Sequence, residues 1–262
     1  MNLNQDWEQE AENWIAWART PDHDAYWLFR DSFFRLLPSP GRATLELGCG
    51  EGRVARDLAA RGHRVTGVDA SPTLLRAANE AQPGGDYVLA DAAALPFAAA
   101  SFDLVVAYNS LMDVQDMPGA VREAARVLES GGRLCVCVTH PLADAGRFAA
   151  READAPFVIQ DSYFGRRRPW YYGQTFERAG LQMTFRGWAY PFEDYCRALE
   201  DSGLLIEALR EPRVPAEEVE RDPPEQRWRR LPNFLMLRAL KPARLTAAAK
   251  NRGGSSASGA TD

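Results

Sequence analysis

Hydrophobic positions follow a helical period at the start of the chain and a strand-and-helix alternation after residue 42. Residues 6–19 and 24–37 carry Trp and Phe at helical spacing and are separated by a Thr-Pro-Asp turn signal. The alternation then predicts strands at 43–47, 64–68, 87–89, 102–107 and 133–139, and helices at 53–61, 72–80 and 118–128. This order is typical of a doubly wound α/β fold with a mostly parallel sheet.

The alternation stops after the fifth strand and resumes with a predicted helix at 192–201 and strands at 204–209 and 233–240, separated by a Pro- and charge-rich loop. The pattern predicts five parts: an N-terminal helical cap (1–38), a core (39–140), an aromatic-rich insertion acting as a substrate lid (141–191), the C-terminal part of the core (192–242) and a tail (243–262). The tail is rich in Ala, Gly, Ser and charged residues, and we expect it to be disordered.

Composition narrows the classes of function. The 262 residues are 46% hydrophobic, which is enough for a sizeable core, and the formal charge of -5 argues against a general nucleic-acid binder. No apolar run approaches the roughly 20 residues of a membrane span, and the first residues do not resemble a signal peptide. We therefore expect a cytoplasmic protein without membrane or nucleic-acid partners. With three histidines and no Cys-x-x-Cys pair, we also expect no metal site.

The segment Glu46-Leu47-Gly48-Cys49-Gly50-Glu51-Gly52 follows the first predicted strand and precedes a helix. Glycines at such a junction allow positive φ and let a ligand approach the backbone near the helix N-terminus. An acid at the end of the next strand, Asp69, is placed to accept hydrogen bonds from a ribose diol. A dinucleotide-binding oxidoreductase is the rival interpretation, but it requires a small residue at position 53, which is Arg.

These motifs, with Asp91-Ala92 after the third strand, resemble those of the class I S-adenosylmethionine-dependent methyltransferases of the small-molecule type, over about residues 40–140. The resemblance implies a seven-stranded Rossmann-like sheet, S-adenosylmethionine as cofactor, and methyl transfer mainly by proximity and orientation to an O, N or C nucleophile. It implies cofactor contacts from Glu46, Gly48, Gly50, Gly52, Asp69, Ala70, Asp91, Ala92, Tyr108 and Asn109.

The acceptor side is less defined. His140 at the end of the fifth strand is the candidate general base, although a His-Pro pair there could simply end the strand. Asp69 could likewise serve only as a helix cap. Aromatic residues of the insertion and of the helical cap are candidates for an acceptor pocket. The candidate acceptor contacts are Tyr26, His140, Tyr163, Trp170, Tyr171 and Trp188.

Three questions stay open at this level. A protein that keeps the adenosylmethionine fold could catalyse a non-methylating reaction such as cyclisation, or could bind the cofactor in a regulatory role. The fourth strand ends in Tyr108-Asn109-Ser110-Leu111 and lacks the Asn/Asp-Pro-Pro-Tyr/Phe motif expected of enzymes that methylate base nitrogens. We therefore expect a small-molecule acceptor, of the kind found in secondary metabolism. The protein is expected to be a monomer or a homodimer.

Overall fold

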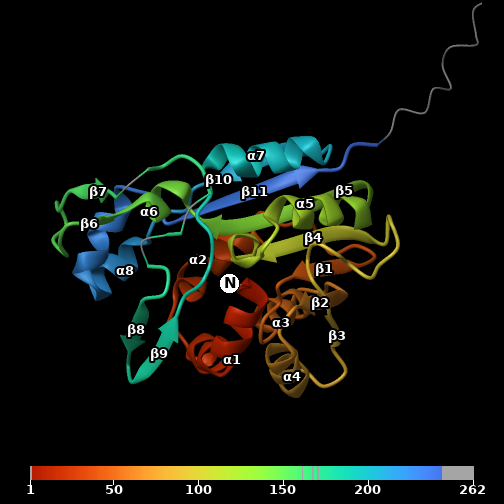
Figure 1. The fold of residues 1–262 in the computed structure, drawn as a ribbon, viewed down its shortest axis with the longest axis horizontal. Coiled ribbons are helices and arrows are strands. Elements are labelled where there is room, and N and C mark those ends of the chain that lie inside the picture. The colour runs from red at the N-terminus through yellow and green to blue at the C-terminus, as the bar shows by residue number, and fades with distance from the viewer. Residues whose placement is uncertain (1, 161, 167, 170, 244–262) are drawn as a thin grey trace, which may run out of the picture.

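The structure, a computed structural model, describes residues 2–160, 162–166, 168–169 and 171–243. Within this part of the chain, five parallel strands form the centre of a seven-stranded sheet: β1 (Thr44–Leu47), β2 (Val65–Asp69), β3 (Asp86–Leu89), β4 (Phe102–Tyr108) and β5 (Leu128–Thr139). The antiparallel strands β11 (Phe234–Leu240) and β10 (Leu205–Arg210) extend it beyond β5, in the order β10-β11-β5-β4-β1-β2-β3 (Figure 1). The predicted seven-stranded, mostly parallel sheet is confirmed.

Side-chain alternation along the central strands divides the core between the two faces of the sheet. In β5, Leu134, Val136 and Val138 pack on the face covered by α5 (Met117–Val127) and α7 (Phe192–Asp201). Cys135 and Cys137 point to the opposite face, where α2 (Ala25–Phe34) and α3 (Arg53–Ala60) pack. Both thiols are buried and free, and burial raises the pKa of Cys135 to about 12. They therefore act as small apolar core residues.

Helix α1 (Leu3–Arg19) lies at the edge of the sheet's carboxyl end and contacts α4 (Pro72–Ala81). It begins at an Asn2 cap, whose side chain accepts a hydrogen bond from the Asn4 N–H. The side chain of Glu8 bonds Ser71 and accepts from the Thr73 hydroxyl at 2.7 Å, at the N-terminus of α4. These contacts hold α1 beside the ends of β1 and β2.

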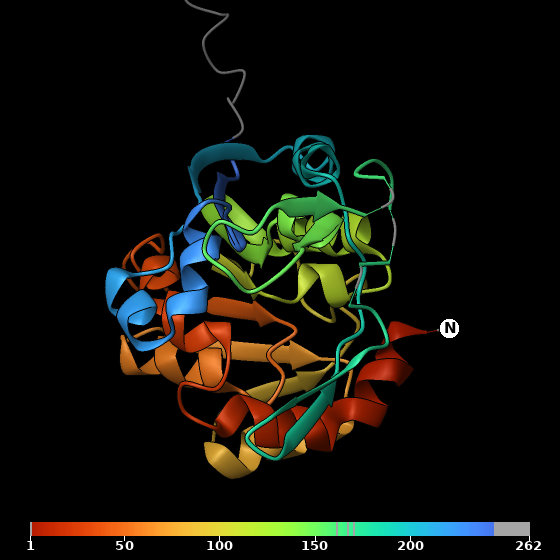
Figure 2. The same cartoon turned by 90° about the vertical axis from the view of Figure 1, so that its left-hand side faces the viewer.

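The insertion after β5 consists of α6 (Pro141–Ala145) and two hairpins, β6 (Gly146–Phe148) with β7 (Phe157–Ile159) and β8 (Thr175–Arg178) with β9 (Leu181–Thr184). The β8–β9 hairpin lies beside α1 (Figures 1 and 2). Phe185, just after β9, meets Trp14 and Trp17 of α1 edge-on, at ring centroid distances of 6.5 and 5.9 Å. Phe185 therefore docks the insertion on the N-terminal helix.

The Pro- and charge-rich segment before β11 is not a simple loop as predicted. It contains α8 (Ala216–Arg221) and the 3-10 helix η2 (Pro223–Arg229). Trp228 packs edge-on against Phe148 at 4.9 Å, and Arg230 donates to the Ala155 carbonyl oxygen at 2.7 Å. The segment thus anchors the β6–β7 hairpin. Residues 244–262 of the predicted disordered tail lie outside the described residues. Within the described part of the chain, we find no helix with the length and apolar character needed to span a membrane.

Candidate functional site

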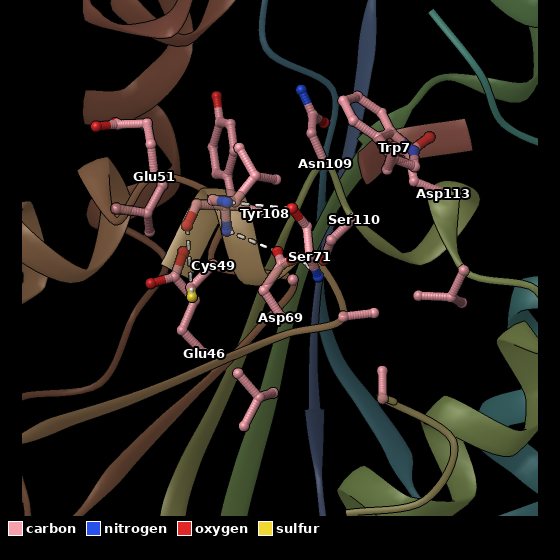
Figure 3. Close-up of a pocket in the computed structure, with 18 of the residues that line it drawn as sticks. Trp7, Glu46, Cys49, Glu51, Asp69, Ser71, Tyr108, Asn109, Ser110 and Asp113 are labelled. Atoms are coloured by element: carbon pink, nitrogen blue, oxygen red, sulfur yellow. Dashed lines mark hydrogen bonds between the residues drawn. The ribbon is translucent and has the colours of Figure 1, made fainter. Parts of the chain in front are cut away.

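A cavity lies at the carboxyl end of the central strands, between the sheet and α1 (Figure 3). In open α/β sheets this edge is where ligands bind. Nine of the ten predicted cofactor residues line it: Glu46, Gly48, Gly50, Asp69, Ala70, Asp91, Ala92, Tyr108 and Asn109. Residues that the sequence did not single out also line it, among them Asn4, Trp7, Trp14, Ser110 and Asp113.

The glycine loop is shaped by close approaches on both sides. Gly48 has φ +65, and a Cβ there would lie 2.6 Å from the Cβ of Ser110, whose hydroxyl donates to the Leu47 carbonyl oxygen at 2.6 Å. Gly50 has φ +56 and faces the Trp14 indole. Only glycine fits this conformation and this space without strain. The ends of β1 and β4 are thereby pressed together at the cavity.

Gly52 differs from the expectation of a cofactor contact. It is not among the residues lining the cavity, and it caps α3 with φ +83. A Cβ there would lie 2.9 Å from the Tyr87 hydroxyl and 3.0 Å from the Ala78 Cβ. The third glycine therefore allows α3 to pack closely against α4 and β3.

Asp69 ties the end of β2 to the glycine loop. One carboxylate oxygen accepts from the Gly50 N–H at 2.8 Å, and the other accepts from the Ser71 N–H at 2.9 Å. Burial raises the pKa of Asp69, while these backbone donors lower it. A carboxylate oxygen can accept more than one hydrogen bond, so Asp69 keeps acceptor capacity for a ligand hydroxyl. It fixes the loop and presents a charge to the cavity at the same time.

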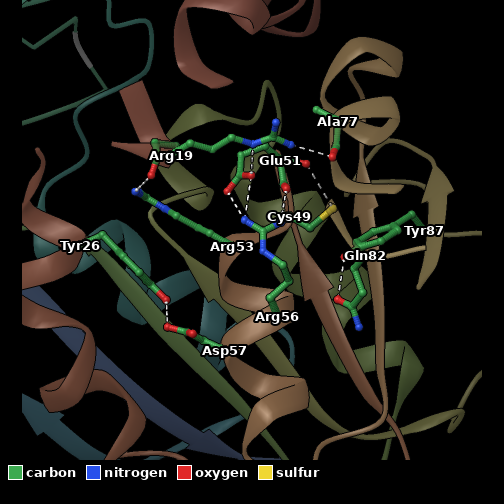
Figure 4. Close-up of polar contacts among 12 residues, drawn as sticks. Arg19, Tyr26, Cys49, Glu51, Arg53, Arg56, Asp57, Ala77, Gln82 and Tyr87 are labelled. Carbon is green, nitrogen blue, oxygen red and sulfur yellow. Dashed lines mark hydrogen bonds and ion pairs between the residues drawn. The ribbon is translucent and has the colours of Figure 1, made fainter. Parts of the chain in front are cut away.

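Two buried glutamates of this region have opposite surroundings. Glu51 is 1% exposed and is paired with Arg56 at 2.8 Å and Arg19 at 3.0 Å, as Figure 4 shows. Glu46 is 2% exposed and lines the cavity, yet its Oε2 has no hydrogen-bond partner in the described part of the chain. Burial, then repulsion from Asp69 and Glu51, raises the pKa of Glu46 well above its ordinary value. A buried acceptor without a partner indicates a place for a ligand donor.

Two further residues that line the cavity, Asn109 and Asp91, carry polar groups that are unpartnered or exposed. Asn109 adopts φ 50 after β4, and its buried Oδ1 lacks a partner among the described residues. Asp91 is exposed and accepts from the Ala93 N–H at 2.8 Å. Together with Glu46 and Asp69, these groups provide acceptors for a ligand that carries an ammonium, a ribose diol and an amino-substituted base. The residues present therefore fit S-adenosylmethionine.

Helix α1 supplies aromatic side chains to the wall of the cavity, whereas the sequence pattern predicted only that this helix belongs to an N-terminal cap. Trp7 and Trp14 line the cavity and stack edge-on at 5.8 Å. Arg53 joins this helix to the loop: it pairs with Asp24 at 2.8 Å and lies over the Trp14 ring at 5.0 Å. Trp7 and Trp14 are seven positions apart, so they share one face of a helix. That spacing was visible in the sequence, but which surface the helix would cover was not.

His140 does not line the cavity. Its Nδ1 accepts from the Leu142 N–H at 3.1 Å and caps α6, and its Nε2 lies 3.0 Å from Glu211 Oε1. Burial lowers the pKa of His140, so the neutral ring is favoured. With Nδ1 accepting and Nε2 donating, neither nitrogen has a lone pair for a substrate proton. The structure thus places the candidate base in the role of a helix cap.

Four other acceptor-site candidates, Tyr26, Tyr163, Tyr171 and Trp188, also lie away from the lining of the cavity. Tyr26 is buried and donates to Asp57 at 2.5 Å, and Tyr163 accepts from the Phe192 N–H at 3.0 Å. Tyr171 donates to Asp144 at 3.1 Å, and Trp188 carries the Arg168 guanidinium 3.5 Å above its ring. Trp170 lies outside the described residues. None of the acceptor-site candidates that the structure describes lines this cavity.

Comparisons with known proteins agree with this geometry. Residues 45–136 match the family model described as a methyltransferase domain. The chain is 36% identical over 129 residues to demethylmenaquinone methyltransferase of Tropheryma whipplei, covering 45% of this chain and 50% of that protein. It is 39% identical over 97 residues to malonyl-[acyl-carrier protein] O-methyltransferase of Erwinia pyrifoliae, covering 36% and 37% of the two chains.

The fold also matches a crystal structure over most of its length. An S-adenosylmethionine-dependent methyltransferase from Mesorhizobium loti superposes with a TM-score of 0.69 at 26% identity, covering 84% of this chain and 99% of that one. By contrast, the chain spans about half the length, or less, of the curated relatives described above. The matching family model covers residues 45–136, which include the glycine loop from Gly48 to Gly52.

Proposed function

We propose that this chain is a class I S-adenosylmethionine-dependent methyltransferase that transfers the cofactor's methyl group to a small-molecule acceptor. The observation that carries the proposal is the unpartnered Glu46 carboxylate in a cavity whose other polar groups, Asp69, Asn109 and Asp91, follow successive strand ends. When bound, the cofactor supplies an electrophilic methyl group on a sulfonium, which an O, N or C nucleophile of the acceptor can attack.

The protein's contribution is to bind, to orient and to exclude water. Glu46 would hold the ammonium of the cofactor, Asp69 the ribose and Asp91 the adenine amino group. Trp7 and Trp14 of α1, together with Val114, provide apolar surface beside these groups. Holding two reactants at attack distance in a water-poor site supplies much of the rate enhancement of such a displacement. The relatives named above are described as methylating demethylmenaquinone and a malonyl group, which supports an acceptor other than nucleic acid.

The test is a thermal-shift comparison of S-adenosylmethionine, S-adenosylhomocysteine, NAD and NADP, each near 100 times its dissociation constant or at the solubility limit. A true ligand at that level stabilises by about 2.7 kcal/mol, which raises the midpoint by roughly 5–10 °C for a chain of this size. We expect shifts with the first two ligands only. A shift with NAD or NADP alone would refute the cofactor assignment. Transfer of labelled methyl to a panel of aromatic and apolar acceptors then separates methylation from a non-methylating role.

A further inference from the structure

The cavity is small for the ligand that its polar groups fit. Its volume is about 110 Å³, which is less than the roughly 150 Å³ of an apolar cavity that holds benzene. S-adenosylmethionine joins an adenine, a ribose and a methionyl chain, and it is much larger than benzene. One wall of the cavity must therefore move outward before the whole cofactor can enter.

The two walls of the cavity differ in how firmly they are built. Glu46 and Asp69 belong to β1 and β2, and each of these strands is hydrogen-bonded to a neighbouring strand on both sides. The wall across from the sheet is made by Asn4, Trp7 and Trp14 of α1, a single helix that lies between α4 and the β8–β9 hairpin (Figure 1). The helix is therefore the wall that is able to move.

The C-terminal end of α1 is anchored. Trp17 is 6% exposed and packs edge-on against Phe185 at 5.9 Å. The Arg19 guanidinium donates to the buried Glu51 carboxylate at 3.0 Å and to the Ala77 carbonyl oxygen at 2.8 Å. An apolar contact and a charged pair thus hold this end against three different parts of the structure.

The N-terminal half of α1 is held by fewer contacts. Among its described residues, only Leu3 and Ala11 are buried. Two of its hydrogen bonds to other elements are long, at 3.5 Å from the Leu3 N–H to Gln115 Oε1 and at 3.4 Å from the Thr184 N–H to Glu10 Oε2. An element with few buried apolar contacts opens locally at a lower free energy than the whole protein unfolds. This half is therefore able to swing away from the sheet about the anchored end.

Glu8 makes the short hydrogen bonds of this half to the rest of the protein. Its Oε1 accepts from the Thr73 hydroxyl at 2.7 Å, and its Oε2 accepts from the Ser71 hydroxyl. The Ser71 N–H in turn donates to Asp69 at 2.9 Å. Glu8 thus ties α1 to the same turn that positions an acid of the cavity.

We propose that the N-terminal half of α1 is a lid over the cofactor and that Glu8 is the latch that holds it closed. This inference rests on the proposed function. Glu8 is a positioning residue, since it acts through Ser71 and Thr73 and is not among the residues that line the cavity. With the latch closed, Trp7 and Trp14 cover the ligand. With the latch open, the cofactor enters and the product leaves.

The rates of ligand exchange test the latch. Stopped-flow mixing with S-adenosylmethionine and with S-adenosylhomocysteine gives association and dissociation rates from tryptophan fluorescence, with Trp7 and Trp14 as reporters at the cavity. A chase of tritium-labelled ligand with unlabelled ligand measures dissociation independently.

Because opening precedes both entry and exit, Glu8→Ala should raise the association rate and the dissociation rate by about tenfold each, the size expected for lost hydrogen bonds to a charged acceptor. The dissociation constant should change by less than about threefold, because a latch that acts on both rates alike leaves their ratio nearly constant. Damage to the ribose site alone would raise only the dissociation rate.

Two further variants make the outcome specific. Glu12→Gln removes an exposed ion pair with Arg76 on the same helix, and it should keep both rates within about twofold of the unmodified protein. Glu8→Gln keeps a side-chain oxygen that can accept from the Thr73 hydroxyl, so its rates should lie between those of the unmodified protein and Glu8→Ala. It serves in place of Glu8→Ala if that variant does not fold.

Unchanged rates in Glu8→Ala, faster dissociation without faster association, or an equal acceleration in Glu12→Gln would overturn the latch while leaving the proposed function intact. Failure of the unmodified protein to bind either ligand would instead overturn the proposed function, and this inference with it. The two failures are therefore distinguishable in the same series of measurements.

Discussion

Replacing Glu46 with Gln should make the ligand-free protein more stable and its cofactor complex weaker. The substitution keeps the size of the side chain and removes a carboxyl group that is 2% exposed and has an unpartnered oxygen. Buried groups of this kind reduce stability, and they persist where a ligand needs them. The two effects have opposite signs, which separates them from a simple loss of folding.

The magnitude follows from the raised pKa of Glu46, whose ordinary value is near 4.5. A raised folded pKa gives stability that is fully present below the ordinary value and is lost as the pH rises through the folded value. The loss grows with pH, and at pH 7 we take its size from the cost of a buried polar group without a partner, which is about 1–3 kcal/mol. We expect Glu46→Gln to recover about 1–3 kcal/mol there, which raises the unfolding midpoint by roughly 3–10 °C.

The assay is thermal or denaturant unfolding of both proteins without ligand from about pH 4.5 to about pH 8, followed by calorimetry with S-adenosylmethionine. The stability difference should grow with pH, and the dissociation constant should increase by about 5–150-fold, equivalent to about 1–3 kcal/mol. Glu51→Gln is the matched control. It should lower stability by about 1–3 kcal/mol at pH 7, because Arg19 and Arg56 lose a charged partner. If Glu46→Gln also destabilises and binding is unchanged, the reasoning is refuted.

Three further substitutions, one of them with a control, test the roles of Asp69, Gly48 and His140. Asp69→Ala should weaken S-adenosylmethionine binding by about 1–3 kcal/mol, and unchanged affinity in calorimetry would argue against its ribose role. Gly48→Ala should cost at least about 1–3 kcal/mol of stability and abolish cofactor binding, because the added Cβ would lie 2.6 Å from the Ser110 Cβ. Gly84→Ala is its control: Gly84 has φ +82 and open space around it, so this variant should show the cost of the backbone strain alone. His140→Ala should cost about 1 kcal/mol as a lost cap and keep initial rates within about threefold; a larger loss of turnover at full cofactor affinity would restore it as the base.

The core and the cofactor side of the site were predictable because both depend on short-range patterns. Alternation in β4 and β5 and the helical period of α5 are set by which face each side chain buries. The predicted bounds of β4 and α5 fall within one residue of the observed ones, whereas β5 begins at Leu128, five residues before its predicted start. The glycine loop, Asp69 and Asp91 are each positioned by the strand that precedes them. A residue at the end of a parallel strand lies at the carboxyl edge of the sheet, and this position does not depend on contacts with distant parts of the chain.

The part of the cavity wall that comes from α1 and η1 was not predictable for the opposite reason. Trp7 and Trp14 reach the cavity only because α1 docks on α4 and on the β8–β9 hairpin. Asp113 keeps its place beside the cavity only because residue 187 is glycine, since a Cβ there would lie 2.6 Å from Asp113 Oδ1. These contacts join residues that are far apart in sequence, and no local pattern marks them. Conversely, the aromatic residues of the insertion attracted attention by number, and among them Phe185 anchors it to α1 and Phe148 to η2.

The charges of the cavity also bear on the choice between the two nucleotide cofactors of this fold. Four acids line it without a basic partner among the described residues: Glu46, Asp69, Asp91 and Asp113. The lining base Arg53 is paired with Asp24, and the lining acid Glu51 with two arginines.

Such a site favours a ligand that carries an ammonium and a sulfonium and repels the pyrophosphate of a dinucleotide. Affinity for S-adenosylmethionine should therefore fall as salt rises, and any residual binding of NADP should increase. Equal salt responses of the two ligands would show that shape, and not charge, makes the selection.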